Sequence, residues 1–288
     1  MEGNQIWDYI GPELQQVREL VRASLSSDIR LLNQTNDNLL QHNGKMVRPV
    51  LALLVAKACS QGIVTPDTLL FACAAELMHN ATLLHDDVAD NSPVRRGQPT
   101  VMSILGGRAS VLLGDFWLVK AVERILQARN NAEAAVRIFA ATLSDLAEGE
   151  MLQLQKAETL DATENDYYRI IYNKTASLFE AAAATAAMSV GASTAYRKAV
   201  KTYAVQLGTA FQIRDDILDV ISTEEELGKP IGSDARNEKT TWVTLYGMEA
   251  AEAEVSRLSD EAVGLLDTLP GDTSFFRDFI RRLEKRTK

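Results

Sequence analysis

The stretch Leu69–Asp90, LLFACAAELMHNATLLHDDVAD, decides the fold, because it reads as one long helix that is apolar on almost every face. Thr65 and Pro66, just ahead of it, suit the N-cap and the first turn of that helix. A helix without a broad polar face is buried among other helices. The stretch therefore predicts an all-α bundle with this helix at its centre.

The end of this stretch carries three carboxylates, Asp86, Asp87 and Asp90. Residues three and four apart share a helix face, so Asp86 and Asp90 project together and Asp87 leans toward Asp90. Three anions at that spacing repel one another unless a cation lies between them. A solvated acidic face is one interpretation of a single cluster. The other is a site for Mg²⁺, which prefers hard oxygen ligands and completes its shell with water and phosphate oxygens.

A second cluster with the same spacing, Asp215, Asp216 and Asp219, lies far downstream in another apolar helical run. Two such clusters are improbable by chance. Six carboxylates facing each other across a cleft would bind a small group of Mg²⁺ ions, and those ions would bind a strongly anionic group. The pair of clusters therefore predicts a metal-dependent site for a diphosphate.

The rest of the chain also favours helices. Apolar residues recur at helical spacing over residues 14–32, which predicts one amphipathic N-terminal helix. No linker divides the chain, so we expect residues 1–288 to form a single domain. We see no convincing strand and no repeat, and further helices are predicted near residues 49–59, 109–127, 132–156, 164–191, 194–221, 250–266 and 275–283.

Composition narrows the range of functions. Hydrophobic residues make up 46% of the chain and aromatic residues only 6%, which favours helix packing, and the formal net charge of -9 argues against a nucleic-acid partner. Cys59 and Cys73 lie in apolar helical runs, where a buried reduced thiol is the usual state. No signal peptide is evident and residues 181–192, the most apolar stretch, are too short to span a bilayer. We therefore expect a cytoplasmic protein that is not transmembrane.

Basic residues accompany the first cluster, although each alone is a weak signal. Lys45 and Arg48 lie at a predicted helix start, and Arg95 and Arg96 follow the aspartates in a loop. Both pairs suit phosphate, the first through helix-terminal N–H groups and the second through bidentate guanidinium contacts. A lone histidine on a buried helix is most often a core residue. His79 lies two turns before the aspartates on nearly the same face, which leaves a ligand role open as well.

Further polar residues accompany the second cluster. Lys174 and Thr175 interrupt an otherwise core-like helix, and Gln212 shares a face with the aspartate three residues after it. The segment after the cluster holds Lys229 and Lys239 and is rich in Gly, Asn and charge, so we expect a mobile lid there. Either lysine alone would ordinarily be a surface residue.

Six motifs stand in a definite order over nearly the whole chain: Gly-Lys-x-x-Arg-Pro at 44–49, His-Asp-Asp-x-x-Asp at 85–90, Arg-Arg-Gly at 95–97, Gly-Glu at 149–150, Lys-Thr at 174–175 and Phe-Gln-x-x-Asp-Asp-x-x-Asp at 211–219. In these the chain resembles the trans-type polyprenyl diphosphate synthases of the class I isoprenoid synthase fold. The resemblance implies a bundle of about ten or more helices around a central cleft. It also implies a homodimer that condenses isopentenyl diphosphate with an allylic diphosphate by Mg²⁺-assisted ionisation.

The resemblance assigns roles to these residues. Isopentenyl diphosphate would be held by Lys45, Arg48, His79 and Arg96, and the allylic diphosphate by Arg95, Lys174, Thr175, Gln212, Lys229 and Lys239. The leading Mg²⁺ ligands would be Asp86, Asp90 and Asp215, with Asp87, Asp216 and Asp219 in or near the shell. The residues that would carry catalysis are Asp86, Asp87, Asp90, Asp215, Lys174 and Arg95.

Product length is predicted from the turns before the first cluster. Ala81 and Thr82 occupy the turn where short-chain members tend to carry an aromatic residue, and Leu77 and Met78 lie one turn further back. A tail growing along this helix would pass small side chains. We expect a product longer than geranylgeranyl diphosphate, which can partition into a membrane. The lid departs from the family pattern, with Trp242 in a normally more aliphatic continuation.

Three other functions were weighed. A terpene cyclase or head-to-head synthase of the same fold needs no isopentenyl diphosphate site, so the Gly-Lys-x-x-Arg and Arg-Arg motifs argue against it. A metal phosphohydrolase would use His42, His85 and Asp86, but the further carboxylates beside His85 fit it poorly. A catalytically silent partner subunit should have lost part of one aspartate cluster, and both are intact.

Overall fold

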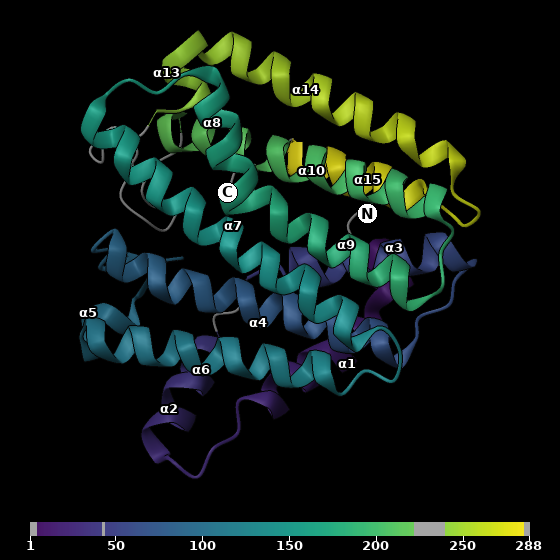
Figure 1. Cartoon of the computed structure of the whole chain (residues 1–288), viewed down its shortest axis with the longest axis horizontal. Coiled ribbons are helices and arrows are strands. Elements are labelled where there is room, and N and C mark those ends of the chain that lie inside the picture. Colours follow the sequence, from purple (N-terminus) through teal and green to yellow (C-terminus); the bar gives the residue numbers. More distant parts are fainter. Residues whose placement is uncertain (1–4, 42–43, 222–239, 285–288) are drawn as a thin grey trace.

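The computed structural model describes residues 5–41, 44–221 and 240–284, so His42, Lys229 and Lys239 lie outside the described residues. The all-α class predicted from the sequence is confirmed (Figure 1). The helices are α1 (Gln5–Ser24), α2 (Arg30–Gln41), α3 (Val47–Ser60), α4 (Pro66–Ala89), α5 (Val101–Leu105), α6 (Gly107–Leu126), α7 (Ala132–Thr159), α8 (Glu164–Ile171), the π-helix η1 (Tyr172–Ala176), α9 (Ser177–Ser189), α10 (Thr194–Ile221), α13 (Trp242–Tyr246), α14 (Met248–Gly264), the short 3-10 helix η2 (Leu265–Thr268) and α15 (Ser274–Glu284).

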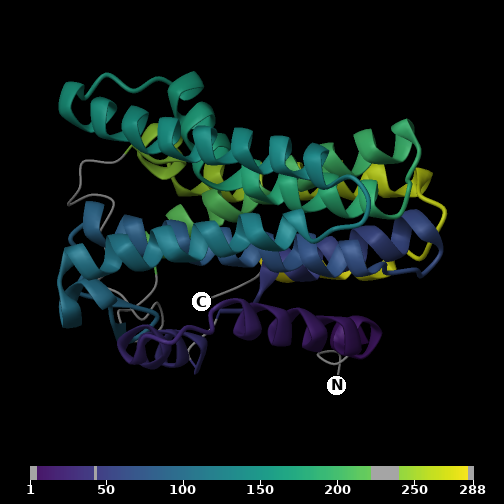
Figure 2. The same cartoon turned by 60° about the horizontal axis from the view of Figure 1, so that its bottom comes forward.

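Helix α4 lies at the centre of the bundle, as the sequence predicts. It begins in a capping box, in which the Thr65 hydroxyl accepts a hydrogen bond from the Thr68 backbone and the Thr68 side chain caps Thr65 in return. It packs against α1, α3, α6 and α9, and in Figure 2 the purple N-terminal helices lie below α4 and α6 while the green helices lie above them. Phe71 and Leu77 are fully buried. Each such side chain stabilises the fold by roughly 1.5–3 kcal/mol.

The single N-terminal helix predicted over residues 14–32 is wrong, because the chain forms two helices there. Helix α1 ends at Ser24, and a turn separates it from α2. The Ser27 backbone donates to the Asn33 side chain at 3.0 Å, and the Asn33 amide donates to the Ser27 carbonyl at 2.6 Å. Local side-chain bonds of this kind compete with helix formation. The buried Asn36 then anchors α2, since it donates to the Leu25 carbonyl and accepts a bond from Trp117.

Two further elements differ from the predicted pattern. The loop after the first aspartate cluster contains a two-stranded antiparallel hairpin of β1 (Val94–Arg95) and β2 (Gln98–Pro99), turned by residues with positive φ. The helix predicted over residues 164–191 is interrupted by η1, whose five residues have π-helical hydrogen bonds. Close packing surrounds this interruption, because a Cβ on Gly208 of α10 would lie 2.6 Å from the Cα of Ala176.

Two smaller expectations can also be compared with the structure. Cys59 and Cys73 are both buried free thiols, as predicted. Within the described residues, no helix combines the length and the apolar character needed to cross a bilayer.

Candidate active site

The first aspartate cluster lies at the C-terminal end of α4. Asp87 is buried, whereas Asp86 and Asp90 are half-buried, and the Asp90 backbone N–H closes the last turn on the Asp86 carbonyl at 2.8 Å. The carbonyl end of a helix disfavours negative charge. Three carboxylates at this end therefore need compensation from cations.

The pKa of Asp86 indicates that the cationic side chains of the protein do not fully compensate the negative charge of this cluster. Burial raises the pKa of Asp86 to about 6, and the negative charge of Glu150 acts in the same direction. The positive charge of Lys174 opposes the shift. Burial also raises the pKa of Asp87, although Arg95 counteracts it. A carboxyl with this raised pKa gains from any cation placed beside it.

The hairpin after α4 brings the two arginines back to the aspartates. The Arg95 Nε–H donates to the Asp87 Oδ1 at 2.6 Å, which is a short charge-assisted bond. Arg96 has a φ of 54°, and its guanidinium lies against Gly44, where an added Cβ would be 2.7 Å from the guanidinium carbon. The glycine of the Gly-Lys-x-x-Arg motif therefore leaves room for the arginine of a distant motif. The sequence does not reveal this contact.

A second group of positive charges lies beside α4 around Arg48 and His79. Arg48 is buried, with its guanidinium carbon 4.7 Å from the centre of the Phe179 ring, whereas Lys45 is exposed. Burial lowers the pKa of Arg48 to about 10, so it stays positively charged at neutral pH. Burial lowers the pKa of His79 well below its usual value, and the charges of Arg48 and Arg96 lower it further. His79 is therefore a neutral imidazole among cations.

Helix η1 positions Lys174 and Thr175. The Lys174 ammonium lies 2.9 Å from the Gln153 Oε1 and forms an ion pair with Glu150, both on α7. A Cβ on Gly149 would lie 2.6 Å from the Cβ of Asn173, so α7 approaches η1 closely only because residue 149 is glycine. The π-turn, a feature frequent at functional sites, thus places the lysine beside the first aspartate cluster.

The second aspartate cluster lies on α10, with Asp216 and Asp219 buried and Asp215 half-buried. The two oxygens of Asp216 each accept a bond, Oδ1 from the Gln212 amide at 3.1 Å and Oδ2 from the Tyr167 hydroxyl at 2.6 Å. Gln212 is itself oriented, because its Oε1 accepts the Thr175 hydroxyl at 2.8 Å. Thr175, Gln212 and Asp216 therefore form one connected chain of hydrogen bonds.

The two clusters share one electrostatic environment. The negative charge of Asp215 raises the pKa of Arg48, and the positive charge of Lys174 lowers the pKa of Asp86. In the described part of the chain, no three carboxylate, imidazole or thiol groups lie close enough to hold a metal ion by themselves. The donor set still suits Mg²⁺, which usually takes one or two carboxylates and fills its remaining positions with water and phosphate oxygens.

The residues assigned to product length are all in place on α4. Leu77, Met78 and Ala81 are fully buried in the core, and Thr82 is half-buried with its hydroxyl bonded to the His79 carbonyl at 2.8 Å. They therefore line the interior of the bundle rather than its surface. The role in product length remains a prediction.

Sequence reasoning missed several residues at this site. The sequence assigns no role to Tyr167, to Gln153 or to Glu76, a buried carboxylate near Arg48. A buried charged residue on an otherwise apolar helix is the one signal that points to Glu76. The tyrosine gives no such signal, because tyrosines occur commonly in half-buried helices.

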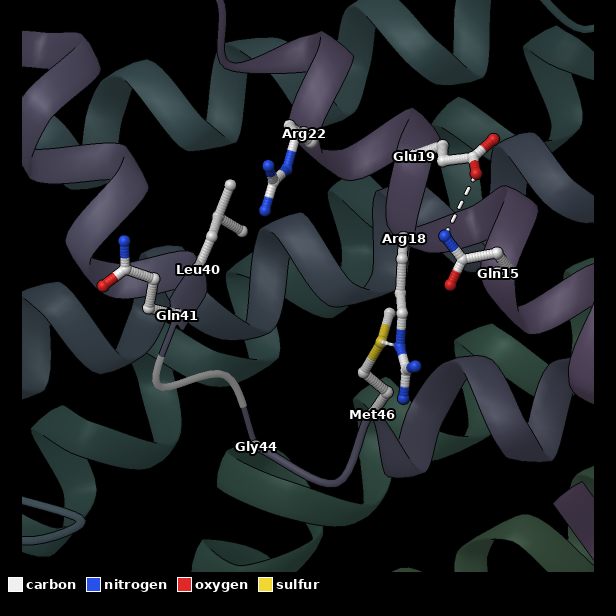
Figure 3. A pocket seen from close by; sticks show the side chains of 8 residues that line it. All are labelled: Gln15, Arg18, Glu19, Arg22, Leu40, Gln41, Gly44 and Met46. Carbon is white, nitrogen blue, oxygen red and sulfur yellow. Dashed lines mark hydrogen bonds between the residues drawn. The ribbon is translucent and has the colours of Figure 1, made fainter.

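A separate cavity of about 550 Å³ lies between α1, α2 and the segment Gly44–Met46 (Figure 3). Arg18 and Arg22 extend into it from α1, and the Arg18 Nε–H donates to the Met46 sulfur at 3.3 Å. The described residues that line it include none to which a role in the predicted site was assigned. Gly44, which also contacts Arg96, lies between the cavity and that site.

Comparison with solved structures defines the class of this fold. The chain superposes with a TM-score of 0.89 on the polyprenyl synthase from Caulobacter crescentus complexed with calcium and isoprenyl diphosphate, at 29% identity, and the match covers 98% of this chain and 95% of that chain. A profile of the Polyprenyl synthetase family matches residues 29–268. The chain belongs to this family, whose members act on isopentenyl and allylic diphosphates, and it is a prenyltransferase.

Two relatives show how far sequence identity discriminates within the family. The octaprenyl diphosphate synthase of Haemophilus influenzae is 37% identical over 263 residues, 91% of this chain and 79% of that protein. The short chain isoprenyl diphosphate synthase of Methanothermobacter thermautotrophicus is also 37% identical, over 261 residues, 88% of this chain and 79% of that protein. Overall identity therefore does not decide product length.

The raised pKa of Asp86 predicts a pH-dependent gain in stability for Asp86→Asn in metal-free protein. An unfolded aspartate titrates near pH ~3.9, so above about pH 6 the folded state must bear a charge that burial disfavours. Removing that charge should raise the free energy of unfolding at pH 7 by on the order of 1–3 kcal/mol. The gain should shrink as the pH falls through 6 toward 4, where wild-type Asp86 is protonated. Urea denaturation in a chelator across this range measures it.

Asp161→Asn is the control with the opposite sign. A hydrogen bond from Thr159 and the ion pair with Lys156 lower the pKa of this exposed carboxyl. Its substitution should therefore give no gain at pH 7. Equal unfolding free energies for wild type and Asp86→Asn at pH 7 would show that Asp86 is not strained by burial.

Proposed function

We propose that this chain, as a single domain, joins isopentenyl diphosphate to an allylic diphosphate with Mg²⁺ and extends the product to a trans polyprenyl diphosphate longer than geranylgeranyl diphosphate. The observation that supports it best is the shared electrostatic environment of the two aspartate clusters, in which Lys174 lowers the pKa of Asp86 and Asp215 raises the pKa of Arg48. Such an arrangement suits two diphosphates held side by side.

The basic group around Arg48 is the proposed site for isopentenyl diphosphate. Arg48 is fixed by burial under Phe179, and Arg96 is held against Gly44, so both guanidiniums are oriented before the substrate arrives. The exposed Lys45 adds a third positive charge. Neutral His79 can donate one N–H to a phosphate oxygen without adding to the repulsion among the arginines.

The allylic diphosphate is proposed to lie between the aspartate clusters. Asp86, Asp90 and Asp215 would hold Mg²⁺, with Asp87, Asp216 and Asp219 in or near the shell. Mg²⁺, when bound, neutralises the diphosphate and stabilises the charge that develops on it as it leaves. Lys174 and Arg95 place positive charge on the same group, and Thr175 and Gln212 orient it. Lys229 and Lys239 are also proposed to contact the allylic diphosphate.

The reaction then needs little from side chains beyond positioning. The carbon–oxygen bond breaks with its electron pair going to the diphosphate, and the double bond of isopentenyl diphosphate attacks the allylic cation. The proton that is lost goes to the departed diphosphate. The buried walls formed by α4, α9 and α10 exclude water, which would otherwise capture the cation.

The long product is proposed from the side chains on α4 and from the octaprenyl relative. Ala81 and Thr82 put no large ring in the turn before the aspartates, and Leu77 and Met78 are flexible aliphatic residues one turn further on. Each turn advances ~5.4 Å along the helix axis, comparable with one isoprene unit. The tail is proposed to run along these turns.

The homodimer is proposed from an exposed apolar face on α6 and α7. Its members are large hydrophobic side chains, each at least 39% exposed: Val111, Leu112, Val119, Leu126, Met151 and Leu154. The two helices pack against each other, so these side chains lie on neighbouring helices. Exposed apolar side chains gathered on one part of a surface mark protein–protein contacts. Light scattering tests the proposal, since a monomeric mass at micromolar concentration would contradict it.

Incubation of the purified chain with labelled isopentenyl diphosphate, an allylic primer and Mg²⁺ tests the function. Chain elongation should be Mg²⁺-dependent, and Asp86→Ala or Asp215→Ala should lower turnover by about 100-fold or more, because each removes a metal ligand. Asp267→Ala, at an exposed carboxylate of η2, is the control and should leave turnover unchanged. Near-normal turnover of both cluster variants at saturating Mg²⁺ would rule out the two-cluster mechanism.

The division of the basic residues predicts opposite kinetic effects for two variants. Arg96→Ala should raise the KM for isopentenyl diphosphate by about 10-fold and the KM for the primer little, because one charge-assisted bond to a phosphate is worth ~1.5–3 kcal/mol. Lys174→Ala should do the reverse. Steady-state kinetics with each substrate varied in turn measures both. If both variants weakened the same substrate, the assignment of the two diphosphate sites would be wrong.

Ala81→Phe should shorten the product to about farnesyl or geranylgeranyl length. A phenyl ring in this buried turn would block a tail that runs along α4. The rate of the first condensation serves as an internal control, since it should stay near that of the wild type if the site remains folded. Chromatographic sizing of the products measures the change. An unchanged product distribution would mean that the tail does not pass Ala81.

A further inference from the structure

Tyr167 makes a buried bond to the second aspartate cluster that the proposed reaction does not use. Its hydroxyl donates to the Asp216 Oδ2 at 2.6 Å, and the two residues are only 2% and 4% exposed. The bond links α8 to α10 across 49 residues of chain. A tyrosine hydroxyl has an ordinary pKa near ~10, so it remains a donor at neutral pH.

The ring of Tyr167 is held by an aromatic cluster. Its centroid lies 5.8 Å from the Trp242 ring and 6.0 Å from the Tyr168 ring, and the Trp242 N–H donates to the Ala250 carbonyl at 3.3 Å. Trp242 is itself buried, with 7% of its surface exposed. The phenol ring is therefore packed within a cluster of three aromatic rings.

We propose that Tyr167 is a positioning residue for the metal site: together with Gln212 it holds the Asp216 carboxylate in one orientation toward the proposed Mg²⁺. This inference rests on the proposed function, because it takes the second cluster to be a metal site. Gln212 bonds one carboxylate oxygen and Tyr167 the other. Two donors on different oxygens prevent the carboxylate from turning about its Cβ–Cγ bond.

Two such bonds do not prevent metal ligation. An ionised carboxylate offers about four acceptor positions on its two oxygens. Some groups hydrogen-bond to a metal ligand without touching the metal. Their removal typically lowers the metal affinity by about 10- to 100-fold. The tyrosine therefore matters for the metal without touching it.

Tyr167→Phe tests the proposal with a readout independent of turnover. The phenylalanine keeps the ring and its packing but loses the hydroxyl. The unfolding temperature is measured while Mg²⁺ is titrated at a fixed concentration of inorganic diphosphate. The Mg²⁺ concentration that gives half of the stabilising shift should rise about 10-fold in this variant.

Tyr168→Phe is the matched control. Tyr168 is the next residue, packs on the same Trp242 and also donates to a carboxylate, Glu254 at 2.7 Å, but that carboxylate lies on α14 outside the site. Its half-saturating Mg²⁺ concentration should stay within about twofold of the wild type. Trp242→Leu is a second variant that keeps the hydroxyl and loosens the ring, and it should shift the Mg²⁺ dependence in the same direction as Tyr167→Phe by a smaller factor.

A double-mutant cycle separates positioning from general destabilisation. In an Asp216→Asn background, Tyr167→Phe should leave the Mg²⁺ dependence unchanged, since its effect acts through the carboxylate. An unaltered Mg²⁺ dependence in Tyr167→Phe, an equal shift in Tyr168→Phe, or an effect that persists in the Asp216→Asn background would each overturn the proposal. A wild type that is stabilised by Mg²⁺ and diphosphate but forms no prenyl product would contradict the proposed function and leave the role of Tyr167 supported by the binding measurements.

Discussion

The cost of placing carboxylates at the buried C-terminal end of α4 is the constraint on which the site depends. This end of a helix carries partial negative charge, and burial removes the water that would otherwise solvate the aspartates. Arg95 offsets the charge of Asp87 through a short bond, yet the pKa of Asp86 remains raised. The fold therefore holds negative charge that only additional cations can stabilise. A protein that binds metal and diphosphate recovers that free energy on binding.

The basic residues of the site are arranged so that the repulsion among their positive charges is limited. Burial keeps His79 neutral, so the imidazole adds no charge to the arginines around it. Glu76, buried on α4, places a compensating negative charge near Arg48. Among the described residues, the Arg48 Nε and the Glu76 Oε2 are buried atoms without a hydrogen-bond partner. Unsatisfied polar atoms are rare in stable cores, and the described residues include three others, on Glu13, Gln206 and Ser259, outside this site.

The sequence was sufficient for the features that follow from periodicity. The central position of α4, the two aspartate clusters and the helical class all derive from apolar spacing and from repeated charge, which local sequence records directly. It was insufficient where a few polar bonds decide between conformations. The break after Ser24 depends on Asn33 and Ser27, which bond across a turn, and such bonds leave no periodic signal.

Contacts between distant motifs were beyond sequence reasoning for a different reason. Gly44 contacts Arg96, and Tyr167 contacts Asp216, only because the helices that carry them pack at particular distances. The order of motifs along the chain does not contain those distances. The likeness to a known family is the source of the roles proposed for the basic residues, whereas packing geometry alone reveals the residues that contact them.

The π-helix η1 has a consequence for how this chain can change in length. Tyr167 and Lys174 are seven residues apart and would share one face of a regular α-helix. In the structure Tyr167 bonds to α10 while Lys174 bonds to α7, because the wider turn between them shifts the phase of the helix. The π-turn takes up about one residue more than a turn of α-helix, so a regular helix would keep Tyr167 toward α10 and Lys174 toward α7 only with one residue fewer between them. The number of residues in 172–176, rather than the identity of each, therefore sets the directions of these two side chains.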